Sequence, residues 1–260
     1  MRRASFPCRN ASGCAPGSGS GAWRLTEGAR LGERPEDDNP GGPAEARRAA
    51  PRAVRPRHAA SLLVWRRSGA RGIEVLMGLR HARHRFMPNV LVFPGGRVDR
   101  GDHRAKAISE LRPLTRAGLE RQAPPSLARA LGVAAARELH EETGLVLGRL
   151  ETLRLWPDLA AIDYLCRAVT PPNRFMRFNA RFLIAPAEAA HGAIRGSGEL
   201  EELRFFTLAE ARAHKVATIT AKVLAEFEMW LAMGAEERAT RPLICFRSER
   251  RAQDSRVPER

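Results

Sequence analysis

Three glutamates crowd the end of one predicted helix, and this cluster constrains the fold and the chemistry of the chain more than any other feature. Residues 126–143 are rich in Ala, Leu, Arg and Glu and are followed by Gly144, a composition and a stop signal typical of an α-helix. Glu138, Glu141 and Glu142 are spaced i, i+3 and i+4, so they fall within an arc of about 100° on one helix face. The helix therefore ends in a strongly acidic face.

Such a face is electrostatically unfavourable, because like charges at these spacings repel and the helix dipole disfavours anions near its C-terminus. Arg137 stands four residues before Glu141 and can pair with it, but one cation does not balance three anions. A divalent ion would balance them, and carboxylate oxygens suit Mg²⁺ or Mn²⁺, which keep water ligands and bridge to phosphates. The alternative interpretation is a solvated acidic face, which would suffice for two glutamates.

A pair of glycines supports the metal interpretation. Residues 90–93 predict a short buried strand that is stopped by Pro94, Gly95 and Gly96. Because glycine has no Cβ, a ligand or a metal can approach the backbone closely here, and the carbonyl of Gly96 offers one more oxygen ligand. On their own the glycines indicate a tight turn. Together with the acidic helix they indicate a metal site.

The chain divides into three parts by composition. Residues 1–57 carry clustered Gly, Pro, Ser and Arg and predict a disordered tail; a start codon placed too far upstream is also open, and both are favoured over a targeting peptide. Residues 58–246 predict one domain. Residues 247–260 are charged and aperiodic and predict a frayed C-terminal tail. We expect a cytoplasmic protein, because the four cysteines are too few and too scattered for a disulfide scaffold.

The central part alternates strand and helix patterns. Strands are predicted at residues 59–65 and 73–79, joined by a turn at 68–72, and again at residues 145–147, 164–168, 181–184 and 203–206. Further helices are predicted at residues 208–214 and 218–233. Strands mixed with a few helices are typical of an α+β domain or a layered α/β/α sandwich.

Composition excludes some classes of partner. No apolar run approaches the ~18 residues that span a bilayer, so we expect no membrane partner. The net charge of +15 invites a nucleic-acid role, but 41 of the 44 basic residues are Arg, which together with abundant Ala, Gly and Pro indicates a GC-rich coding bias. We therefore expect a small-molecule substrate rather than nucleic acid, and a homodimer is left open.

The glycine pair and the acidic helix end together resemble a known pattern, the Nudix box, Gly-x5-Glu-x7-Arg-Glu-U-x-Glu-Glu-x-Gly-U, in which U is aliphatic. Gly96 matches its first glycine, and its second half is matched by Arg137, Glu138, Leu139, Glu141, Glu142, Gly144 and Leu145. The sequence departs from the pattern twice. Asp102 stands at the first glutamate, and 34 residues rather than seven separate it from Arg137. The resemblance thus implies a helical insertion at about residues 103–125, and leaves open whether Asp102 supports Arg137.

The resemblance implies a Nudix-like α/β/α sandwich with a mixed sheet, and hydrolysis of a nucleoside diphosphate derivative with Mg²⁺ or Mn²⁺. Carried over by position, Glu138, Glu141, Glu142 and the Gly96 carbonyl would bind metal, and Arg137 would orient the glutamates. The general base varies in this family. Glu138 is one candidate, and the acidic stretch at residues 198–202 is another, although that stretch equally suits a solvated turn.

Within the family, the segment from Val92 to Asp99 and the insertion resemble the acyl-coenzyme A diphosphatase branch. Arg80 and Arg85 match arginines of the coenzyme A signature and, with Arg97, are the predicted substrate-binding residues; ordinary surface arginines explain them about equally well. The alternatives are a nucleotide-sugar or dinucleotide pyrophosphatase, and a non-catalytic Nudix-like module that binds RNA.

Overall fold

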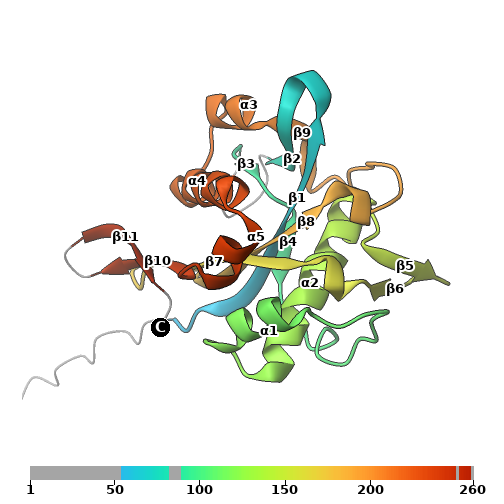
Figure 1. Cartoon of the computed structure of the whole chain (residues 1–260), viewed down its shortest axis with the longest axis horizontal. Helices are drawn as coiled ribbons and strands as arrows, with labels where there is room; N and C mark the ends of the chain where they lie inside the picture. Colours follow the sequence, from blue (N-terminus) through green and yellow to red (C-terminus); the bar gives the residue numbers. More distant parts are fainter. Residues whose placement is uncertain (1–53, 82–88, 250–251, 259–260) are drawn as a thin grey trace, which may run out of the picture. The chain divides into compact units, whose positions relative to one another are not determined.

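The computed structural model describes residues 54–81, 89–249 and 252–258, and a mixed nine-stranded sheet runs through this part of the chain (Figure 1). The strands of this sheet are β1 (Arg57–Ser68), β2 (Gly72–Arg80), β3 (Leu91–Val92), β4 (Gly95–Arg97), β7 (Asp163–Val169), β8 (Phe178–Pro186), β9 (Leu200–Thr207), β10 (Ile244–Glu249) and β11 (Ala252–Pro258). A separate hairpin consists of β5 (Gly148–Glu151) and β6 (Arg154–Pro157). The helices are α1 (Pro113–Glu120), α2 (Pro125–Thr143), α3 (Leu208–Ala213), α4 (Thr218–Ala232) and α5 (Ala235–Thr240).

The twelve-residue strand β1 organises the sheet. It runs parallel to β8 along most of its length, and its end forms an antiparallel hairpin with β2. The beginning of β1 pairs with β4, with Ala60 opposite Gly96. On the other side of β8 follow β7, β10 and β11, and β9 pairs with β2. The sheet therefore mixes parallel and antiparallel pairs, and it fixes β4 beside β1.

Helices cover both faces of this sheet (Figure 1). Successive side chains of a strand point to opposite faces, so Leu62 joins the core cluster that contains α2 residues such as Leu139, and Leu63 joins the cluster that contains Phe227 of α4. All four side chains are fully buried. The expected α/β/α sandwich with a mixed sheet is confirmed, and α2 lies on one face with its acidic end next to β4.

Most predicted elements of the central part are present. The predicted strands correspond to β1, β2, β3, β7, β8 and β9, and the predicted helices to α2, α3 and α4. A single 3-10 turn at Gly69–Arg71 joins β1 to β2 where the turn was expected. Within residues 103–125, the helical pattern corresponds to α1. The predicted tail at residues 1–57 lies outside the described residues as far as residue 53.

Two predictions about secondary structure are wrong, one at residues 145–147 and one at the C-terminal segment. Residues 145–147 form no strand; Val146 makes a single pair of backbone hydrogen bonds with His191, because the segment lies between Gly144 and Gly148, which both have positive φ angles. The C-terminal segment is not a frayed tail, because β10 pairs in parallel with β7 and β11 pairs with β10. The strand begins before this Arg-rich segment, at Ile244, and the buried side chains of Ile244 and Phe246 in one core cluster fix β10 on the sheet.

Candidate metal and substrate site

The acidic end of α2 is shaped by Gly144, the residue that caps the helix. Gly144 adopts a left-handed conformation with φ 77°, and its N–H donates to the carbonyl of His140 at 2.9 Å. The opposite face of the helix is apolar and buried against the sheet, with Leu139 fully inaccessible. Burial of that face leaves Glu138, Glu141 and Glu142 at the surface that meets β4, although Glu142 is itself only 6% exposed.

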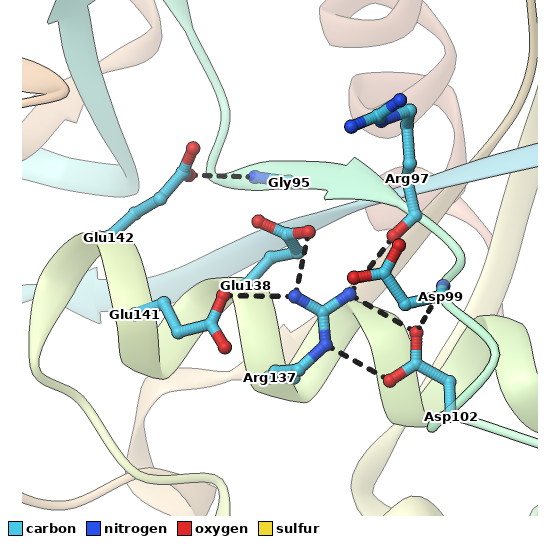
Figure 2. Close-up of polar contacts among 8 residues, drawn as sticks. All are labelled: Gly95, Arg97, Asp99, Asp102, Arg137, Glu138, Glu141 and Glu142. Carbon is cyan, nitrogen blue, oxygen red and sulfur yellow. Dashed lines mark hydrogen bonds and ion pairs between the residues drawn. The ribbon is translucent and has the colours of Figure 1, made fainter.

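The two glycines of β4 allow this close approach. A Cβ on Gly95, whose φ is 154°, would lie 2.5 Å from the carbonyl oxygen of Ala60, so any larger residue would collide with β1. A Cβ on Gly96 would lie 2.3 Å from Oε1 of Glu138, so the glutamate fills the space that a side chain would need. Figure 2 shows the result: the N–H of Gly95 donates to Oε2 of Glu142 at 2.9 Å.

Arg137 is the hub of the hydrogen-bond network (Figure 2). Its Nη1 donates to Oε1 of Glu138 and to Oε2 of Glu141, both at 2.9 Å. Its Nη2 donates to the backbone carbonyl of Arg97 at 3.0 Å, which ties the helix to the end of β4. One planar guanidinium thus orients two of the three glutamates and the glycine strand at once.

Asp102 completes this network, although 34 residues separate it from Arg137 in the sequence. Its two carboxylate oxygens accept from Nε and Nη2 of Arg137 at 3.0 and 3.1 Å, a bidentate pair, and Oδ2 also accepts from the N–H of Asp99 at 2.7 Å. The carboxylate is buried. The question left open by the sequence is therefore answered: Asp102 supports Arg137, and α1 and its flanking loops do not disrupt the pairing.

Burial of Glu138 and Glu142 disfavours their charged forms, and nearby positive charge does not fully compensate for this. Burial raises the pKa of Glu142 to about 8, an effect that the charge of Glu138 reinforces and that the bond from Gly95 opposes. Burial also raises the pKa of Glu138, although Arg137 opposes this. Burial disfavours the charged form of Arg137, but the bond to Asp102 and the surrounding carboxylates outweigh it and raise its pKa. The site holds more carboxylates than Arg137, which bonds to Asp102, Glu138 and Glu141, can neutralise.

The donor set fits a hard divalent cation. The carboxylates of Glu138 and Glu142 lie against the backbone of Gly96 and Gly95 at the contact between α2 and β4, and burial raises the pKa values of both. In the conformation of residues 54–81 and 89–249, no three Asp, Glu, His or Cys side chains converge closely enough to enclose an ion. Arg137 and the Gly95 amide hold the glutamates in this conformation.

The predicted substrate arginines lie in different places. Arg80 ends β2, and its buried Nε has no hydrogen-bond partner among the described residues; its positive charge acts on Glu142. Arg97 is exposed, and Figure 2 shows its guanidinium directed away from Arg137. Arg85 lies outside the described residues. The structure thus brings Arg80, but not the side chain of Arg97, toward the glutamates.

One residue of the acidic stretch at residues 198–202, Glu199, acts on the site through its charge. The charge of Glu199 contributes to the raised pKa of Glu142. Glu201, in contrast, forms an ion pair with His81 at 3.2 Å. The loop that carries Glu199 is fixed to the end of α2, because the N–H of Arg195 donates to the carbonyl of Thr143 at 2.7 Å.

Sequence reasoning missed the role of the Gly95 amide as a hydrogen-bond donor to Glu142. The contact joins residues that are 47 positions apart, so no local pattern could show it. The available signal was the doubled glycine, which indicates a close approach of the backbone to another group without saying which group approaches.

Comparison with known proteins agrees with this geometry. Residues 130–227 match the family model of the NUDIX domain. The match begins inside α2 and ends inside α4, so it includes Arg137 and the three glutamates, and it covers less than half of the chain. A search of curated proteins finds no match for the chain.

Solved structures share the fold. The NUDIX hydrolase from Alicyclobacillus acidocaldarius aligns with a TM-score of 0.54 and 24% sequence identity, over 72% of this chain and 96% of that chain. The MutT NUDIX hydrolase from Burkholderia pseudomallei aligns with a TM-score of 0.42 and 20% identity, over 66% of this chain and 98% of that chain, which is too distant to add to the argument. No helix in the described ranges is long and apolar enough to cross a membrane.

The chain therefore has the Nudix fold, and the fold together with the NUDIX domain match supports a pyrophosphohydrolase.

Proposed function

We propose that the chain is a divalent-metal-dependent hydrolase that cleaves the pyrophosphate bond of a nucleoside diphosphate derivative. The observation that carries the proposal is the network around Arg137, in which Asp102 fixes the guanidinium and the guanidinium orients Glu138 and Glu141 beside Gly96. A solvated acidic face would not need a buried aspartate and two glycines to hold it in place.

In this proposal Glu138, Glu141, Glu142 and the carbonyl of Gly96 hold Mg²⁺ or Mn²⁺. When bound, the ions neutralise the pyrophosphate and lower the pKa of a bound water. The chain's own residues supply position: Arg137 keeps Glu138 and Glu141 in one orientation, and Gly95 holds Glu142 by its N–H. Arg80, whose Nε has no partner among the described residues, is suited to donate to a phosphate oxygen of the substrate.

Two carboxylates are candidates for the general base. Glu138 lies at the centre of the site but already accepts a hydrogen bond from Arg137. Glu199 acts on Glu142 by its charge and makes no side-chain ion pair within the described ranges. If Glu199 is the base, Glu199→Gln should lower kcat and remove the acidic limb of the pH–rate profile, whereas Glu202→Gln should change neither.

The substrate that we favour is coenzyme A or an acyl-CoA, because Arg80 and the Phe-Pro-Gly-Gly segment match the coenzyme A signature. Nucleotide sugars and dinucleotides are the alternatives. We place the enzyme in the cytoplasm, because the four cysteines are too few and too scattered for a disulfide scaffold. The test offers coenzyme A, acyl-CoA, NADH, nucleotide sugars and capped RNA in parallel, with Mg²⁺, Mn²⁺ or EDTA, and separates the products by chromatography.

The proposal expects two phosphorylated products from at least one compound, only with metal. Glu141→Gln should lower kcat about 100-fold or more, and Glu120→Gln is its matched control, because both glutamates are paired with an arginine four residues earlier on a helix. Cleavage of another compound with coenzyme A left intact would reject the coenzyme A assignment alone. RNA binding without metal, with affinity falling steeply as salt rises and no cleavage of any compound, would reject the hydrolase.

A further inference from the structure

A cavity lined by basic side chains lies at the end of β4, the strand that carries the two glycines of the metal site. The cavity, of about 330 Å³, opens between the start of β1, the loop after β4 and the first turn of α2. Its lining is rich in basic side chains and consists of Arg57, His58, Arg97, Val98, Asp99, His103 and Leu127. This volume is at the lower end of the range for small-molecule sites and would admit a phosphate group with a small attached moiety.

The cations that line the cavity are not neutralised by the protein. Within residues 54–81 and 89–249, the side chains of Arg57, Arg97 and His103 form no ion pair and no hydrogen bond. Asp99 is the one carboxylate in the lining, and it lies within ion-pair distance of none of them. Elsewhere in the same ranges, arginines such as Arg112, Arg129 and Arg149 are paired with carboxylates.

A buried arginine adds positive potential behind the cavity wall. Arg181 is 1% exposed, and its Nη1 lies 3.1 Å from Nδ1 of His58. A guanidinium can only donate, so Nδ1 must accept and the ring proton of neutral His58 must sit on Nε2. Burial and the positive charges of Arg181, Arg167 and His103 lower the pKa of His58, which favours the neutral ring. His58 thus adds an N–H donor to the cavity lining.

We propose that this cavity is an anion site that binds a phosphate group. Two arginines and a histidine N–H line one hollow, and a buried third arginine behind its wall adds to their positive potential, so an anion that enters meets positive charge that no carboxylate of the lining pairs with. Arginine suits phosphate because its planar fork donates two parallel hydrogen bonds. The cavity adjoins the Arg137 network through the backbones of Arg97 and Asp99, and it extends away from the glutamates to Leu127, which precedes Glu138 by eleven residues, roughly 16 Å along α2.

The first experiment titrates the full chain with inorganic phosphate by calorimetry, in EDTA so that the metal site does not contribute. Phosphate should bind, and Arg57→Gln should weaken the binding about tenfold or more, with partial recovery in Arg57→Lys. Arg149→Gln, on the hairpin β5–β6, removes the same charge and should leave the binding unchanged. Phosphate that does not bind, or that binds equally well to Arg57→Gln, would overturn the site.

The second experiment identifies the source of the phosphate, and it alone depends on the proposed hydrolase activity. Coenzyme A and 3′-dephospho-coenzyme A differ by one phosphate monoester. If that group occupies the cavity, Arg57→Gln should raise KM about tenfold for coenzyme A and leave KM for the dephospho compound unchanged. Equal KM values with lost phosphate binding would assign the site to free phosphate. If neither compound is cleaved but phosphate still binds, the hydrolase proposal fails and the anion site stands.

Discussion

Replacement of Gly96 by alanine tests whether the position of Glu138 matters for catalysis. The new Cβ would lie 2.3 Å from Oε1, 2.4 Å from Cδ and 2.6 Å from Oε2 of Glu138, whereas ordinary contacts begin at 3.4 Å. The carboxylate must therefore move by roughly 1 Å, and a misplacement of that size costs about 100-fold in rate. The free energy of unfolding should fall by less than about 1 kcal/mol, because the group that moves is the flexible end of a side chain.

The assay is kcat for metal-dependent hydrolysis of whichever compound the substrate screen identifies, with urea unfolding in parallel. Gly101→Ala is the matched control, because nothing lies within 4 Å of a Cβ at Gly101 and the variant should keep wild-type activity. If Gly96→Ala retains kcat within about twofold while folding normally, the packing of Glu138 against Gly96 has no catalytic role, and our reasoning about the site is refuted.

Three further predictions follow from the same contacts. Asp102→Asn should lower the free energy of unfolding, measured in urea, by about 2–4 kcal/mol and should also lower kcat, because it leaves Arg137 without its buried bidentate partner. Unchanged stability would contradict the structural role of the pair between Asp102 and Arg137. Because the pKa of Glu142 is raised from 4.5 to about 8, the metal-free protein should lose several kcal/mol of stability as pH rises through that window, and Glu142→Gln should flatten this part of the curve. Gly144→Ala should cost about 1 kcal/mol by strain at φ 77°, measured by thermal unfolding, with no change in metal affinity.

The parts of the structure that local patterns encode could be predicted from the sequence. The boundaries of α2 followed from its composition and from Gly144, and the pairing of Arg137 with Glu141 followed from the i,i+4 spacing. The burial of the central residues of β1 and β2 follows from their runs of apolar residues. The acidic face of the helix needed no tertiary information to be recognised.

The remaining contacts depend on residues that are far apart in the sequence. The bond from Gly95 to Glu142 and the pair between Asp102 and Arg137 arise only when β4 pairs with β1 and packs on α2. The hairpin β5–β6 was missed because its turn residues, Thr152 and Leu153, have positive φ angles without the usual Asn or Gly signal. Tertiary pairing, not local propensity, makes these elements.

The most direct test of the central claim is a calorimetric titration of the metal-free protein with Mn²⁺ at pH 6, 7 and 8. We expect saturable uptake whose affinity rises with pH, because the ion must displace the proton of Glu142, and an affinity at least tenfold lower in Glu138→Gln and Glu142→Gln. Absence of uptake at every pH, or equal uptake by the wild type and both variants, would contradict the claim that these carboxylates form a metal site.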